Sequence, residues 1–301
     1  MEYNLFMQII PLSRFLFMLV LFFVMGVKAV AGCEVPLAIK SFVTHAKLSQ
    51  IQKSDLDVRR NIKSLQKLCV YEVKINDVHM QWKMTLVFNP KQQKGPFWFL
   101  PHDDEDTAFH TAVYSTLKYG GGFLSVEAKE HRYFRGQDPN RNFSTTLQEA
   151  KSCVQQKFFS PHYTQSVLQI MHVFKPQGYP YLTLHNNTNG GGVSMLHTSK
   201  MVKNYPAHKH ITKQSTGLLD EDSLVYMAGT STIPYAVDLN TFLQKGLNVK
   251  YERVSKINND CSFSNYLALK HPHEKYYNIE TEHGDYMTQK KMLDRVVNII
   301  K

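Results

Sequence analysis

Cysteine is scarce in this chain and never closely paired. Four cysteines occur in 301 residues, and no Cys-x-x-Cys motif is present. A thiolate zinc site and a thioredoxin-like redox centre both require closely spaced cysteines, so the sequence excludes them. Internal repeats and low-complexity segments are absent too, so the chain is not a repeat protein. What remains is a chain of ordinary globular composition, with 43% hydrophobic residues, that is long enough to bury a sizeable core.

A long apolar run is also missing. The N-terminal apolar segment 15–27 has only 13 residues, whereas a membrane-spanning helix needs about 20. Arg14 precedes the segment, and Ala29 and Ala31 follow it with the spacing of a signal-peptidase site. We therefore predict that residues 1–31 are a signal peptide and that the protein is exported to the periplasm or cell envelope. Two alternatives stay open, namely a lipoprotein signal with lipidation of Cys33, or an uncleaved anchor.

Export changes how the four cysteines are interpreted. In an oxidising compartment they can form two disulfides, in any of three pairings. Cys33 with Cys69 would attach the N-terminal segment to the first strand and would leave Cys153 with Cys261. Lipidation of Cys33 would instead leave one free thiol. The sequence does not choose between these arrangements.

The charge of the chain is strongly positive. The formal net charge is +10, and it is +9 once residues 1–31, with two basic and one acidic residue, are removed. Such a chain suits anionic lipids, cell-wall polymers or carboxylate-bearing peptides. The lysines are scattered and no nucleic-acid-binding motif is present, so we do not expect a nucleic-acid partner. The glycine run 190–192 lacks the Lys-Ser/Thr of a phosphate-binding loop.

The hydrophobic pattern alternates between strand-like and helix-like segments. Residues 34–66 are predicted to be mostly helical, and 70–75 and 80–88 to form a hairpin. Further strands are expected at 95–100, 123–128, 179–184, 224–228, 249–254 and 276–282, and helices at 107–119, 146–158, 163–174, 237–243 and 287–300. This order predicts an α/β sandwich around a mixed, mostly parallel sheet flanked by helices. We divide the chain into a signal peptide (1–31), an N-terminal helical extension (32–67) and a catalytic domain (68–301).

Three polar motifs follow predicted strands in this chain. His102 and Glu105 form His-x-x-Glu directly after the strand 95–100, which would deliver an imidazole and a carboxylate to one metal ion. The alternative is a polar helix start, since acidic residues suit the positive end of a helix dipole. The second motif is the loop 135–143, with the sequence RGQDPNRNF, and the third is His185 at the end of a strand. The carboxyl ends of strands are where such folds place their sites.

In this order the motifs resemble the zinc carboxypeptidase family, over about residues 68–301. The loop segment Asp138–Phe143 is the most specific part of the resemblance. The resemblance implies a carboxypeptidase-like sandwich in which His102, Glu105 and His185 bind zinc and leave a fourth position open for water. It also implies that Asp138 orients the ring of the first histidine ligand.

The same resemblance assigns the substrate-binding groups. Asn140 and Arg141 align with the pair that binds the C-terminal carboxylate of the substrate, a role that suits the planar fork of arginine. A further arginine would stabilise the oxyanion. Arg132 and Arg135 are both candidates for it, and Arg132 is favoured.

The general base is expected on the late strand 276–282. Glu280 and Glu282 lie two residues apart and therefore face the same side of the sheet. Glu280 matches the family's glutamate better by its place in the strand, and Glu282 stays open as an alternative. A surface ion pair with lysine is the non-functional interpretation of either residue.

These observations predict an exported zinc-dependent hydrolase that cleaves a peptide amide next to a free carboxylate. Two departures from the family affect the substrate. Asp103, Asp104 and Asp106 surround the first motif, and their negative charge would tighten metal binding or favour a cationic substrate. The interval from Glu105 to His185 is short, which predicts an open cleft suited to compact or branched peptides such as cell-wall peptide. The alternatives are a non-catalytic protein that binds carboxylates or peptides, an amino-acid deacylase on the same scaffold, and a basic envelope adhesin without a site.

Overall fold

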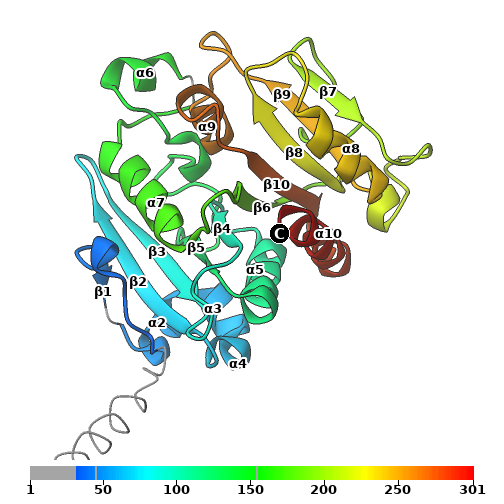
Figure 1. The fold of residues 1–301 in the computed structure, drawn as a ribbon. Coiled ribbons are helices and arrows are strands. Elements are labelled where there is room, and N and C mark those ends of the chain that lie inside the picture. The colour runs from blue at the N-terminus through cyan, green and yellow to red at the C-terminus, as the bar shows by residue number, and fades with distance from the viewer. Residues whose placement is uncertain (1–31, 45, 154) are drawn as a thin grey trace, which may run out of the picture. The chain divides into compact units, whose positions relative to one another are not determined.

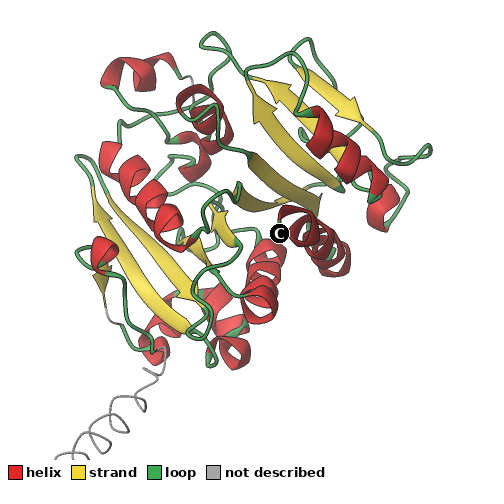
Figure 2. Ribbon diagram, in the orientation of Figure 1, coloured by secondary structure: helices red, strands yellow, loops and turns green. Residues whose placement is uncertain are grey.

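The computed structural model describes residues 32–44, 46–153 and 155–301. The predicted signal peptide, residues 1–31, lies outside the described residues. Residues 35–301 form one compact unit, in which a single twisted sheet is covered by helices on both faces (Figures 1 and 2).

The sheet has ten strands within the described residues, in the order β1-β2-β3-β5-β4-β6-β10-β8-β9-β7. Their bounds are β1 (Val43–Thr44), β2 (Cys69–Asn76), β3 (Gln81–Phe88), β4 (Phe97–Leu100), β5 (Gly122–Val126), β6 (Tyr181–Asn187), β7 (Val202–Tyr205), β8 (Leu224–Gly229), β9 (Asn248–Arg253) and β10 (Tyr276–Glu282).

The prediction of a mostly parallel sheet is wrong. Among the nine strand pairs of the described residues, five are antiparallel: β1–β2, β2–β3, β3–β5, β8–β10 and β7–β9. The four strands β5, β4, β6 and β10 in the middle of the sheet are parallel to one another, as the alternating pattern predicted. The local pattern of each strand does not contain the direction of β8. The chain enters β8 at the same end of the sheet where it leaves β6, so β8 runs opposite to the central strands.

The helices form one layer on each face. Their bounds are η1 (Leu37–Ile39), α2 (Leu48–Ser54), α3 (Leu56–Arg60), α4 (Ile62–Leu65), α5 (Asp106–Tyr119), η2 (Pro139–Arg141), α6 (Leu147–Ser152), α7 (Pro161–Phe174), η3 (Gly217–Leu219), α8 (Ala236–Gln244), α9 (Phe263–Lys270) and α10 (Tyr286–Ile300). Helices α5, α8 and α10 share one hydrophobic core with the sheet, around Phe109, Phe242 and Leu293. Helices α7 and α9 share the other, around Tyr163 and Phe263 (Figure 1).

Most predicted elements are confirmed, and the exceptions have local causes. The hairpin of β2 and β3 pairs in register from Cys69 with Phe88 to Asn76 with Gln81. The predicted helix 146–158 is wrong beyond α6, because the chain turns to an extended conformation at Cys153, which is in a disulfide. Helix α9 was missed because residues 263–268 are all buried, so no amphipathic period marks it. Strand β7 is too short for a clear pattern.

None of the four cysteines is a free thiol. Cys153 and Cys261 are bonded to each other across 108 residues of sequence. Cys33 and Cys69 are disulfide-bonded as well, so the Cys33 sulfur is not available to a lipid. Two disulfides are typical of proteins that fold in an oxidising, extracytoplasmic compartment. Within the described residues, the helices are all too short or too polar to cross a bilayer.

Candidate metal centre and substrate pocket

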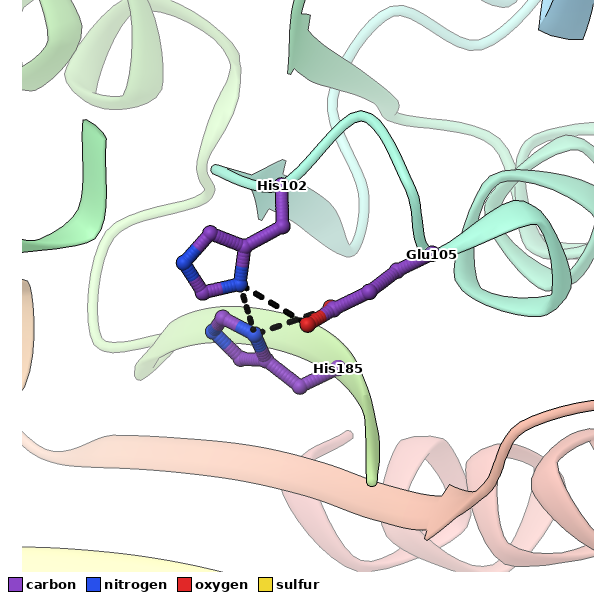
Figure 3. A group of neighbouring side chains, drawn as sticks. All are labelled: His102, Glu105 and His185. Carbon is purple, nitrogen blue, oxygen red and sulfur yellow. Dashed lines mark hydrogen bonds and ion pairs between the residues drawn. The ribbon is translucent and has the colours of Figure 1, made fainter. Parts of the chain in front are cut away.

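Three side chains converge at one end of the parallel strands (Figure 3). His102 lies just past the end of β4, and Glu105 immediately precedes α5. His185 comes from the neighbouring strand β6, inside the strand and not beyond its end as predicted. All three are buried, and they are 3%, 5% and 4% exposed. The short turn between β4 and α5 therefore places two candidate ligands, and the adjacent strand supplies the third.

The donor atoms of this triad fit one metal ion. His102 Nδ1 lies 2.8 Å from Glu105 Oε1 and 3.1 Å from His185 Nδ1, and His185 Nδ1 lies 3.0 Å from Glu105 Oε2. Two donors on a tetrahedral zinc ion are about 3.3 Å apart, so movements of a few tenths of an ångström would admit the ion. Two imidazole nitrogens and one carboxylate are the donor set of a catalytic zinc site with an open position. The residues present therefore fit the metal that the sequence predicted.

Asp138 holds the far side of the first imidazole. His102 Nε2 lies 3.0 Å from Asp138 Oδ1, and Asp138 is the N-cap of η2, where it also accepts a hydrogen bond from the backbone of Asn140. This contact fixes the ring orientation, as a carboxylate behind a histidine ligand does. Burial lowers the pKa of His102, but the Glu105 and Asp138 carboxylates raise it, and the resulting pKa is about 9. The metal-free site therefore carries a proton that a metal ion must displace.

Arg132, Asn140 and Arg141 line the pocket beside the triad. Arg132 donates a hydrogen bond to Glu105 Oε1 at 3.2 Å, so its guanidinium lies at the candidate metal centre. Arg141 contacts Asp138 Oδ2 at 3.3 Å and Asp260 Oδ2 at 3.2 Å. A substrate carboxylate would meet two positive groups here, one beside the metal position and one farther along the pocket.

The two glutamates of the late strand occupy different positions. Glu280 is buried and lines the pocket, directly opposite His185 in the parallel pairing of β10 with β6. Its Oε1 accepts a hydrogen bond from Asn278 at 2.7 Å. Burial raises the pKa of Glu280 above its usual range. Glu282 is half-buried, pairs with Asn187 in register and does not line the pocket.

Arg135 does not reach the pocket. It is exposed and has a left-handed backbone (φ 50°), with its guanidinium 5.7 Å from the centre of the Phe134 ring. The structure thus brings together His102, Glu105, Arg132, Asn140, Arg141, His185 and Glu280, with Asp138 behind them, and leaves Arg135 and Glu282 outside.

The pocket has further lining residues that the motifs did not indicate. They come from the end of β6 and the loop after it, from β8, β9 and β10, and from the start of α9 with the residues before it: Asn186, Asn187, Val193, Tyr226, Glu252, Asp260, Ser262, Ser264, Tyr276 and Asn278. Asn186 and Asn187 directly follow His185 and the others lie outside the three motifs, so spacing in the sequence assigned none of them to the site.

Two of these residues make one end of the pocket acidic. Glu252 on β9 accepts a hydrogen bond from the Tyr226 hydroxyl, and Asp260 pairs with Arg141. Burial raises the pKa of Glu252 to about 7, and the neighbouring charge of Asp260 adds to the rise. The pocket, with a volume of about 120 Å³, therefore combines cationic groups for a carboxylate with anionic groups close by.

No protein-family model matches the chain, and no curated protein matches it. Solved structures match by shape, among them three proteins named "putative metallopeptidase". The one from Shewanella amazonensis SB2B is 15% identical with a TM-score of 0.44, and the match covers 86% of this chain and 98% of that one. Those from Shewanella baltica OS155 and Shewanella denitrificans OS217 are each 12% identical with a TM-score of 0.43, and cover 84% and 89% of this chain and 94% and 98% of theirs. These similarities are too weak to assign a fold or a function.

Proposed function

We propose that this protein is an exported, zinc-dependent hydrolase of the carboxypeptidase type, which cleaves a peptide amide next to a free carboxylate. One observation carries the proposal. A single pocket joins the metal-ligand triad, the carboxylate of Glu280, and the cationic groups of Arg132 and Arg141. A binding protein needs the cationic groups alone, whereas hydrolysis needs all three parts side by side.

Each group of residues in the pocket would have a separate role in amide hydrolysis. A zinc ion bound by the triad would supply Lewis acidity, which polarises a carbonyl and acidifies water. Arg141, with Asn140 beside it, would bind the substrate's terminal carboxylate through paired hydrogen bonds. Arg132 would stabilise the negative charge that develops on the carbonyl oxygen. Glu280, kept from solvent and with its pKa raised, would accept a proton from water and deliver it to the leaving amine.

The size and charge of the pocket support a particular class of substrate. Pockets for drug-sized ligands enclose about 300–1,000 Å³, so a volume of about 120 Å³ suits the end of a peptide better than its middle. Glu252 and Asp260 are half-buried at the pocket wall, and they favour a C-terminal residue with a cationic side chain, because acidic groups attract a positive partner. A short peptide with both a free carboxylate and a free amine near its end, as in cell-wall peptides, meets both requirements.

The first experiment measures the zinc content of the mature protein and its His102→Ala variant. We expect about one zinc per chain in the mature protein and almost none in the variant. A catalytic site has three protein ligands, and its affinity for zinc falls sharply when one of them is removed. Mature protein without bound zinc, or zinc that persists in the variant, would contradict the ligand assignment.

A second measurement separates hydrolysis from binding alone. Zinc-loaded protein is incubated with short peptides that end in lysine, leucine or glutamate, and with an N-acyl amino acid. Release of free C-terminal lysine in preference to leucine and glutamate is the expected result. Binding without release would identify a non-catalytic carboxylate-binding protein, and cleavage of the acyl amino acid alone would identify a deacylase.

A further inference from the structure

A second cluster of acidic side chains lies away from the zinc ligands, in the segment between η3 and β8. Asp220, Glu221 and Asp222 are 4%, 0% and 0% exposed. One carboxylate oxygen from each lies within 4.8 Å of the others. Three carboxylates so close together, taken out of water, repel one another and lose their hydration, so the arrangement requires either a cation or bound protons.

Glu221 distinguishes this cluster from a satisfied acidic turn. Both of its carboxylate oxygens are buried and have no hydrogen-bond partner among the described residues. Its neighbours are already engaged: Asp220 accepts from the backbone of Asp222 at 2.8 Å, and Asp222 accepts from Asn187 Nδ2 at 2.8 Å and from the backbone of Gly190 at 3.0 Å. An unpartnered carboxylate inside the protein is costly, so its two oxygens point to a missing ligand.

The basic residue nearby does not fill this role. Lys250 is buried and senses the charge of Asp222. Its ammonium, however, donates to the backbone carbonyls of Ser194 and His197, at 2.7 and 2.6 Å. Among the described residues, no basic side chain forms an ion pair with any of the three carboxylates. The ammonium of Lys250 therefore does not neutralise the cluster.

The donor chemistry selects the kind of ion. All the side-chain donors are oxygens, which suits a hard cation and not zinc, which prefers nitrogen and sulfur. Calcium takes six to eight oxygens at about 2.3–2.6 Å, so oxygens across the ion are up to about 5 Å apart, in keeping with the spread of the cluster. Magnesium usually retains several waters, and side chains as buried as Glu221 and Asp222 leave little room for them.

We propose that Asp220, Glu221 and Asp222 bind one Ca²⁺ ion at a centre separate from the zinc ligands. The ion would hold the start of β8 to the end of β6 and the loop that follows it, because Asp222 already contacts Asn187 in β6 and Gly190 on that loop. Asn187 and Val193 also line the substrate pocket. Calcium would thereby fix one wall of the pocket. The proposal does not depend on the chemistry carried out there.

The test is a calcium titration by calorimetry, paired with thermal melts. The mature protein is stripped with a chelator, reloaded with one equivalent of zinc, and titrated with CaCl₂. We expect one Ca²⁺ per chain, with a dissociation constant of about 10⁻³ M or tighter, the range of extracellular calcium modules. The melting temperature should rise with Ca²⁺, since an ion that binds only the folded state stabilises it.

Three variants complete the test. Glu221→Gln keeps the shape of the side chain but removes its charge, and should weaken Ca²⁺ binding at least tenfold. Glu274→Gln is the matched control, because the Glu274 side chain is 44% exposed, and it should bind like wild type. His102→Ala should lose zinc and keep calcium.

Several results would overturn the proposal. They are the absence of saturable binding by the wild type, equal binding by Glu221→Gln, or loss of calcium binding in His102→Ala, which would place the ion at the zinc centre. If the carboxyl groups share protons instead, the melting temperature of the wild type should not respond to Ca²⁺, and Glu221→Gln should melt at a higher temperature than wild type. Should Glu221→Gln fail to fold, Asp220→Asn takes its place, and the wild-type titration alone still decides.

Discussion

At the residue scale, the structure separates two glutamates that the sequence could not. Glu280 and Glu282 share a face of β10, and spacing alone gives them equal claims. The pairing of β10 with β6 places Glu280 opposite His185 at the pocket, and it places Glu282 opposite Asn187, where its side chain does not line the pocket. That register depends on contacts between segments almost a hundred residues apart, so no local pattern contains it.

Replacing Glu280 tests this assignment. We expect Glu280→Gln to lower kcat by about two to four orders of magnitude, the usual contribution of a general acid–base group, with zinc content unchanged. Glu282→Gln is the matched control and should stay close to wild type in peptide-release assays. Equal losses in the two variants would contradict the role given to Glu280.

The pKa of His102 leads to a pH-dependent affinity for zinc. In the metal-free site this pKa is about 9, above the unperturbed value of 6.5, so the imidazole is protonated at neutral pH and zinc must displace the proton. Zinc affinity should therefore rise about tenfold per pH unit up to about pH 9 and then level off. Competition with a zinc indicator at several pH values measures it.

Asp138→Asn provides the control for this pH dependence. A neutral amide no longer raises the pKa of His102, so the rise in zinc affinity should end at a lower pH. A rise that ends at the same pH in both proteins would show that another group carries the proton.

The site was only partly predictable at this scale. His102 and Glu105 could be predicted from the sequence, because a spacing of three residues across one turn is enough to place them together. Asp138 could be predicted because its loop has a recognisable sequence. Glu252 and Asp260 were not, since single acidic residues on distant segments give no signal until the sheet brings them to Arg141.

At the scale of elements, the same division applies. The hairpin and the central parallel strands follow from alternation and short connections, which are local properties. The antiparallel direction of β8 and the burial of α9 on all sides depend on long-range packing, which the hydrophobic period cannot express.

The Cys153–Cys261 disulfide is an element-scale prediction. It closes a loop of 108 residues, for which the chain-entropy contribution is about 4–5 kcal/mol. The backbone of Phe143 also donates to the Cys261 carbonyl at 2.9 Å, which ties the disulfide to the loop of Asn140 and Arg141. Cys153→Ser with Cys261→Ser should therefore lower the melting temperature markedly and raise KM more than it lowers kcat. An unchanged KM would disconnect the disulfide from substrate binding.

At the scale of the whole molecule, the two disulfides agree with a protein that folds in an oxidising, extracytoplasmic compartment. Expression of the full chain in a bacterial host should yield an extracytoplasmic protein that begins at Gly32, with all four cysteines oxidised. Intact-mass measurement reads both features at once. A diacylglycerol mass on Cys33 would contradict the disulfide-bonded state of that residue, and a product that retains residues 1–31 would indicate an anchor.

Because Glu280 lies opposite His185 on the adjacent strand, an insertion or deletion can change the position of one relative to the other only by whole residues along the strand. Side chains along a strand alternate between faces, so a one-residue insertion in β10 before Glu280 would send its carboxylate to the opposite layer of the protein. A two-residue insertion would restore the face but displace the group by about 7 Å. The surrounding loops could lengthen or shorten without altering this spacing. Changes in substrate preference should therefore arise in the loops, while the two strands tolerate substitution but neither insertion nor deletion.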